Sequence, residues 1–211
     1  MDGLQLKESE EKSEKVLGVY LQSNLKWSKH SKELQLRLKS RLLGLRKVQN
    51  ILSLEKRKVV AQAIFQSVLS YCIAVWGGTV KGDIENLQVI QNRAAQFVLN
   101  IRGWRVHRQE MYKNLGGLTV NQLVAFHRIL AVYCIRKSGE PEYLADMLSR
   151  DNCRGNIIVP PTVLSLLKRS FVFHGAELWN RVPLVYRQIQ CTRQFKLKLR
   201  QWILANIPRF Q

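Results

Sequence analysis

The sequence predicts a mainly α-helical fold with a short N-terminal β-hairpin, a basic three-helix bundle and a helical C-terminal extension. Apolar residues alternate with polar ones over residues 16–27, which is typical of paired strands. From residue 28 to residue 101, apolar side chains recur at helical spacing in three successive segments. Further helical patterns with capping signals follow. Apolar residues make up 46% of the 211 residues, which argues against wholesale disorder.

The N-terminal part divides into a leader and a hairpin. Residues 1–15 are rich in Glu, Lys and Ser without periodicity, so we expect a flexible leader. Residues 16–27 predict two strands joined by a turn at residues 22–24, with alternating apolar positions at Leu17, Val19, Leu21, Leu25 and Trp27. Gly18 fits a close approach by another backbone, although a bulge is an equally common reason for glycine in a strand.

Three helices are expected in the next part of the chain. The first, residues 28–49, has one apolar arc and carries Leu36 and Leu43 on the opposite side, so we expect it to pack on two sides. The second, residues 53–76, lies mostly in an uncharged stretch, and we interpret it as a buried central helix rather than a membrane span. The third is capped by Asp83 and has one apolar face.

The remainder is expected to be a connector and an extension. Thr119 followed by Gln122 is a capping-box signature. Thr192 can cap a last helix. The segment 150–162 has the weakest pattern and is the candidate boundary. The predicted units are residues 1–15 as leader, 16–101 as hairpin plus bundle, 102–150 as helical connector and 151–211 as basic C-terminal extension.

The charge balance points to a polyanionic partner. The chain has 34 Lys and Arg against 15 Asp and Glu, a net charge of +19 and a pI near 10.2. Such an excess is costly through self-repulsion and is most often retained where nucleic acid is bound. We therefore expect RNA, DNA or an RNA/DNA hybrid as partner. An anionic membrane surface and an uninformative basic surface are the alternatives, and no membrane partner is predicted.

The candidate contacts to nucleic acid gather in the first predicted helix. Lys32, Lys39 and Arg46 are spaced by seven and form one row, whose alternative interpretation is a solvated face. Trp27 and Trp104 lie beside cations and are the better candidates for base stacking, whereas the other tryptophans lie in apolar patterns. The full predicted set is Gly18, Lys26, Trp27, Lys29, Lys32, Arg37, Lys39, Arg46, Lys47, Arg102 and Arg105.

Several segments carry a family resemblance, in the expected order along most of residues 16–204. They are residues 17–30 (LGVYLQSNLKWSKH), 70–77 (SYCIAVWG), 84–95 (IENLQVIQNRAA), 169–171 (RSF), 175–183 (GAELWNRVP) and 195–199 (FKLKL). They resemble the part of non-LTR retrotransposon reverse transcriptases (LINE-like, jockey type) that follows the catalytic palm. The resemblance implies a primer-grip hairpin at 16–27, a helical thumb at 28–101 and a C-terminal extension. It also implies that fingers and palm would precede residue 1.

The catalytic motif of that family is missing here. Polymerases of this family hold two Mg²⁺ with an Asp-Asp pair and one further Asp. This chain has no Asp-Asp pair, and its aspartates stand alone at Asp2, Asp83, Asp146 and Asp151. We therefore expect no catalytic or metal-binding residue and no cofactor, since Mg²⁺ would belong to the missing palm. The predicted function is a truncated fragment of an RNA-directed DNA polymerase that binds primer/template and is inactive alone. A protein-interaction module and an RNA-binding protein recruited from a retrotransposon are the alternatives.

The remaining reactive side chains give no site. The histidines lack metal-ligand spacing, except that His107 lies near Glu110, so structural or surface roles are expected. The four cysteines are far apart and make no Cys-x-x-Cys pair, which favours a reduced, intracellular protein, nuclear or cytoplasmic. The N-terminus lacks the pattern of a signal peptide.

Overall fold

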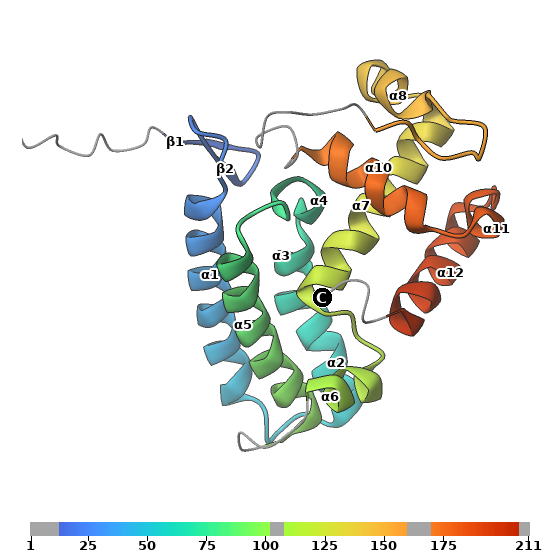
Figure 1. Cartoon of the computed structure of the whole chain (residues 1–211). Coiled ribbons are helices and arrows are strands. Elements are labelled where there is room, and N and C mark those ends of the chain that lie inside the picture. Colours follow the sequence, from blue (N-terminus) through green and yellow to red (C-terminus); the bar gives the residue numbers. More distant parts are fainter. Residues whose placement is uncertain (1–12, 102–107, 160–169, 207–211) are drawn as a thin grey trace, which may run out of the picture.

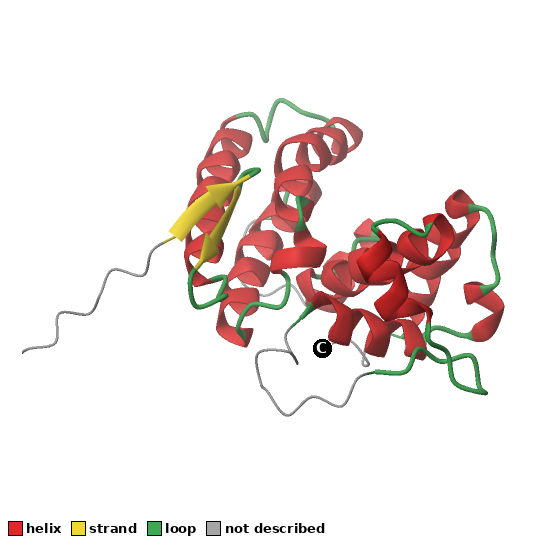
Figure 2. Ribbon diagram, turned by 90° about the horizontal axis from the view of Figure 1, so that it is seen from above, coloured by secondary structure: helices red, strands yellow, loops and turns green. Residues whose placement is uncertain are grey.

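The computed structural model describes residues 13–101, 108–159 and 170–206. It is mainly helical with an N-terminal two-stranded sheet, which confirms the predicted fold class. The hairpin lies at the edge opposite to the C-terminal helices (Figure 1, Figure 2). The elements are β1 (Ser13–Val16), β2 (Val19–Gln22), α1 (Ser28–Lys47), α2 (Leu54–Val60), the π-helical turn η1 (Ala61–Gln66), α3 (Ser67–Ser70), α4 (Ile73–Trp76), α5 (Lys81–Leu99), α6 (Arg108–Leu115), α7 (Val120–Ser138), α8 (Glu142–Ser149), α10 (Phe171–Arg181), α11 (Leu184–Arg187) and α12 (Thr192–Ala205).

The hairpin is shifted from the predicted position. β1 and β2 pair antiparallel, and Leu17 and Gly18 form the turn with φ of 47° and 85°. Two-residue hairpin turns with positive φ match the twist of the strands, and glycine adopts such φ without strain. The chain does turn at the predicted residues 22–24, where the Leu25 N–H donates to Gln22 O at 2.9 Å, but this turn leads from β2 toward α1 and does not join the two strands as predicted. Residues 13–15 belong to a strand rather than to the leader. Gln22 Oε1 accepts two hydrogen bonds at the start of α1, one from Ser28 Oγ (3.0 Å) and one from the backbone N–H of Lys29 (2.9 Å).

Helix α1 packs through one face only. Its buried leucines lie toward the bundle, beside α5 and η1, at Leu34, Leu38, Leu42 and Leu45. Leu36 and Leu43 are 60% and 62% exposed, so the expected second packed face is not formed. Packing on the opposite side would need another element there, and within the described residues none covers it (Figure 1).

The segment predicted as one continuous central helix is interrupted. After α2, the π-helical turn η1 and α3, the chain turns at Tyr71 and Cys72, whose φ is 51°, and α4 follows. Trp76 becomes completely buried and donates its Nε1–H to Tyr71 O at 2.8 Å, so the break is stabilised by tertiary packing. Among the described residues, no helix has the length and apolar character needed to cross a membrane.

Helix α5 begins earlier than predicted. Its first residue is Lys81 after Val80, so Asp83 lies in the first turn instead of at the cap. The carboxylate of Asp83 accepts a hydrogen bond from Thr79 Oγ1 at 2.8 Å. A carboxylate in the first turn also favours the positive end of the helix dipole.

Helix α7 is the central element of the C-terminal part, in contact with α4, α8, α10 and α12. Its predicted capping box is confirmed: Thr119 Oγ1 accepts from Gln122 N (3.4 Å), and Gln122 Oε1 accepts from Thr119 N (2.9 Å). The last helix, α12, begins at Thr192 and has Cys191 at its N-cap position, so the prediction that Thr192 caps this helix is wrong. One hydrophobic cluster extends from Leu34 of α1 to Ile203 of α12.

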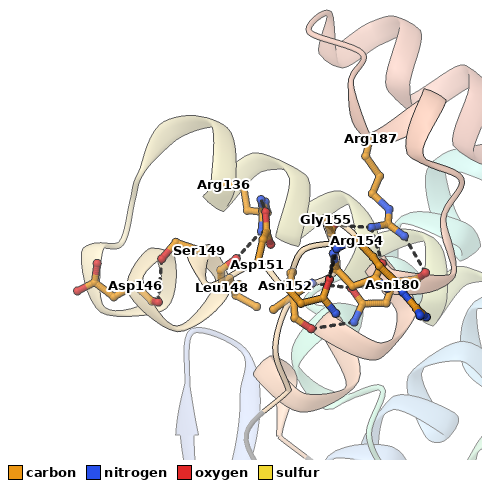
Figure 3. A network of polar contacts seen from close by, with 12 residues as sticks. Arg136, Asp146, Leu148, Ser149, Asp151, Asn152, Arg154, Gly155, Asn180 and Arg187 are labelled. Carbon is orange, nitrogen blue, oxygen red and sulfur yellow. Dashed lines mark hydrogen bonds and ion pairs between the residues drawn. The ribbon is translucent and has the colours of Figure 1, made fainter.

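A polar network holds the segment after α8 against α10 (Figure 3). The side-chain amide of Asn180 donates to Ile157 O (2.9 Å) and accepts from Ile157 N (2.8 Å). Arg187 donates to Gly155 O (2.8 Å), and its guanidinium lies 5.9 Å from the ring centroid of Trp179. Arg136 of α7 forms an ion pair with Asp151, which follows α8, at 2.7 Å. This network holds residues 151–157, which are part of the segment 150–162 in which the sequence predicts a boundary, whereas residues 160–162 lie outside the described residues.

Candidate nucleic-acid interface

The outer face of α1 presents the predicted row of cations. Lys32, Lys39 and Arg46 are all exposed. In the described part of the chain, none of the three forms an ion pair with a carboxylate. Because an α-helix rises about 1.5 Å per residue, the row extends over roughly 21 Å. That length corresponds to about six base-pair steps of duplex at 3.4 Å each.

The other residues of α1 that were predicted to contact nucleic acid are exposed as well. Lys29 is exposed in the first turn, and its Nζ lies 5.8 Å from the ring centroid of Tyr20. Arg37 is exposed, near enough to His30 to lower the pKa of that imidazole. Lys47, the last residue of the helix, is exposed as well. Cations are therefore present from the first to the last turn of this face, which also exposes Leu36 and Leu43.

The predicted residues before α1 are placed differently. Lys26 is exposed. Trp27 is half-buried and packs against the core, so only part of its ring is accessible to a base. Gly18 lies in the hairpin turn, and a Cβ there would stand 3.5 Å from Tyr71 Cε1. The turn itself explains this glycine without a ligand. Arg102 and Arg105, like Trp104, lie outside the described residues.

A structural explanation exists for part of the basic charge on α1. Arg46 and Lys47 lie in its last turn, where cations favour the negative end of the helix dipole. That effect is worth about 0.3–1 kcal/mol at exposed positions. It does not extend to Lys32 or Lys39, which lie one or more turns away from the C-terminus.

Several arginines elsewhere are used within the fold. Arg57 is buried and donates to three carbonyl groups, at the turn after α1 and at the end of α5. Arg128 is buried and donates to Ala74 O at 3.0 Å, and burial lowers its pKa to about 10. Arg136 pairs with Asp151. The net charge of +19 includes all of these arginines, although only exposed cations can contact a polyanion.

The hairpin contributes two residues that the sequence analysis did not select. Lys15 and Tyr20 are paired across the strands, and Lys15 Nζ lies 5.8 Å from the centroid of the Tyr20 ring. Together with Lys29 they form a cation–aromatic cluster at the start of α1. The signal that could have revealed them is Gly18, because a turn at residues 17–18 fixes this pairing.

The described histidines, His30, His127 and His174, lie on three different helices, α1, α7 and α10. His30 is buried against Trp76, with ring centroids 5.5 Å apart, and burial first and Arg37 second lower its pKa to about 4. Burial is also the first cause of the lowered pKa of His127 and His174. Within the described ranges, no three His, Cys, Asp or Glu side chains gather as potential metal ligands.

No protein-family model, curated protein or solved structure matches the chain. The likeness to reverse transcriptases therefore rests on the sequence segments alone. The geometry that bears on function is the exposed cationic face of α1 with the cluster at its N-terminal end.

Proposed function

We propose that this chain binds nucleic acid through its phosphate backbone, with the outer face of α1 as the contact surface. The observation that carries the proposal is the row of Lys32, Lys39 and Arg46, exposed and without carboxylate partners among the described residues. The opposite face of the helix is anchored in the core, so the backbone that carries the row is held in place. Rigid positioning reduces the entropy that a side-chain network loses on binding.

In this proposal the chain is the primer/template-holding part of a reverse-transcriptase-derived polypeptide. The resemblance of residues 17–30 and of the helices that follow supports this more specific assignment. The described residues supply binding, and a carboxylate-bearing palm would supply the two Mg²⁺ and the chemistry. Contacts to phosphate carry little sequence information, so binding is expected to be weakly specific and strongly dependent on salt.

The decisive experiment compares two triple variants of equal charge. The first is Lys32→Gln, Lys39→Gln and Arg46→Gln, and the matched control is Arg154→Gln, Arg193→Gln and Lys198→Gln, at exposed positions elsewhere. Binding of a short labelled RNA/DNA hybrid is followed by fluorescence anisotropy between roughly 50 and 200 mM salt. With about 0.9 counterions released per phosphate contact on a B-form duplex, the α1 variant should reduce the slope of log K against log salt by about 2.7.

The control variant should change the slope by less than the value for one phosphate contact, about 0.9. If both triples reduce binding equally, only the total charge matters and the α1 interface is wrong. If the control triple causes the larger loss, the recruited RNA-binding protein, in which the C-terminal extension dominates, becomes the better explanation. Unchanged binding by the α1 variant at low salt would also refute the proposal.

The hairpin provides an observation that favours the second candidate function, a protein-interaction module. Val16, Leu17 and Leu21 are exposed, Leu17 to 85%. Exposed apolar side chains grouped on one element often mark a protein interface. Replacing Leu17 and Leu21 by serine should abolish recovery of a protein partner while hybrid binding persists. Loss of hybrid binding in the same variant would argue against this second function.

A further inference from the structure

A cavity of about 460 Å³ lies on the side of the bundle away from the outer face of α1. Its walls come from α2, η1, α3, α5, α6, the loop before α7, α7 itself and α12, and none of its described lining residues belongs to α1. Pockets for small molecules typically measure roughly 300–1,000 Å³. The cavity is therefore large enough for a small organic ligand and separate from the proposed nucleic-acid interface.

The lining combines an apolar surface with cationic groups. Phe65, Phe126 and Leu123 contribute to the apolar part. Lys58 and Arg200 bring positive charge, and no Asp or Glu is among the described lining residues. This combination fits a ligand with an apolar body and a negatively charged group.

Both cations keep hydrogen-bonding capacity. Lys58 Nζ pairs with the exposed carboxylate of Glu55 at 2.9 Å, and Arg200 Nη2 donates to Gly116 O at 2.6 Å. An ammonium group has three donors and a guanidinium has five, so each retains N–H groups beyond these bonds. An anion in the cavity could receive them as charge-assisted hydrogen bonds.

His127 adds a group that reports on charge in the cavity. It lines the cavity, and its pKa is lowered by burial first and by Lys196 second. No carboxylate contributes to this shift. An anion bound beside the imidazole would favour the protonated form and raise the pKa.

We infer that this cavity binds a small organic anion with a flat aromatic ring, in addition to the proposed binding of nucleic acid by α1. The required chemistry is shared by nucleoside monophosphates and aromatic carboxylates. The ring packs against the apolar wall, while the phosphate or carboxylate meets Arg200 and Lys58. The side-chain amide of Gln62, also in the lining, offers a neutral donor and acceptor to the same ligand.

The first test is calorimetric titration of the full chain with four probes: adenosine 5′-monophosphate, indole-3-carboxylate, adenosine and inorganic phosphate. At least one of the two ring-bearing anions should bind saturably, and roughly tenfold more tightly than uncharged adenosine and than phosphate alone. The tighter anion identifies phosphate or carboxylate as the preferred group. Equal binding of adenosine would overturn the inference, as would the absence of saturable binding by both anions.

The second test uses matched variants. Arg200→Gln should weaken binding by roughly tenfold or more, whereas Arg193→Gln, exposed on the same helix and outside the cavity, should not. Gln62→Glu preserves the side-chain shape but adds a repelling charge and should abolish binding. Equal affinity in Arg200→Gln and Arg193→Gln would overturn the assignment, and so would unchanged affinity in Gln62→Glu.

The third test follows the His127 ring signals by NMR during a pH titration. The bound anion should raise the His127 pKa relative to the free protein, whereas an unchanged pKa would place the ligand elsewhere and refute the site. Hybrid binding by the Arg200→Gln protein should match that of wild type. Failure of anion binding in the cavity can thus be distinguished from failure of nucleic-acid binding at α1.

Discussion

Replacing Gly77 by alanine is expected to destabilise the protein although the backbone there is unstrained. Gly77 ends α4 with a φ of −64°, which any residue adopts, so glycine is not required for conformational freedom. A Cβ at this position would stand 2.7 and 2.8 Å from the two methyl carbons of Val124 on α7 and 2.5 Å from Ile73 O. Contacts this close force the neighbouring groups to move.

The expected cost follows from the crowding at this contact. Adding a methyl group to a well-packed site costs about 1–3 kcal/mol. In a chain of this size each kcal/mol corresponds to about 2–4 °C in Tm, so Gly77→Ala should lower Tm by roughly 2–12 °C. The matched control is Gly44→Ala in the last turn of α1, where a Cβ meets nothing within 4 Å; because helix ends fray, this change should stabilise by at most about 0.8–1 kcal/mol.

Urea unfolding and thermal melting followed by circular dichroism would measure both effects. Adding Val124→Ala to the Gly77→Ala protein should recover part of the loss, with a coupling energy of about 0.5 kcal/mol or more. The recovery remains partial because the contact with Ile73 O persists. A Gly77→Ala protein as stable as wild type would show that α4 and α7 do not approach so closely.

Three further changes probe other parts of the fold. Asn180→Ala removes both hydrogen bonds to Ile157 and should cost about 1–3 kcal/mol in urea unfolding; a loss below 0.5 kcal/mol, roughly the noise level for surface changes, would contradict the network. Thr119→Ala should cost about 1 kcal/mol through loss of the capping box, compared with Asn121→Ala at an exposed position in the same turn. The unfolded chain protonates His30 near pH 6.5, whereas the folded chain does so only near pH 4. The free energy of unfolding should therefore fall by as much as about 3 kcal/mol as the pH falls from about 6.5 to about 4. His30→Phe should flatten this dependence, and an unchanged slope would show that His30 is not its source.

Local sequence signals predicted the elements whose stabilising contacts are themselves local. The capping box at Thr119 was predicted correctly because both partners lie three residues apart. The helical spacing of apolar residues located α1 and its buried face. The hairpin was predicted to exist but was placed about five residues too late. The alternation continues through residues 16–27, and the choice of turn depends on which position tolerates positive φ.

The candidate interface was predictable in part. The spacing of Lys32, Lys39 and Arg46 placed them on one face, and the structure leaves that face exposed. The sequence could not separate these cations from Arg57, whose partners are carbonyl groups up to 41 residues away. The sequence also could not show that Leu36 and Leu43 remain exposed, because their burial depends on whether another element packs against them.

The sequence by itself determined the helical class, the position of the leucine face that α1 buries and the cationic row on the same helix, since helical periodicity depends on residue spacing alone. That α1 packs through this face only was decided by the tertiary structure. Only the tertiary structure decided where the central helix breaks, which arginines are used within the fold and that a cavity lined by Lys58, His127 and Arg200 exists. These features join residues tens of positions apart. Their free energies depend on burial and on distances across elements, which no local pattern of side chains records.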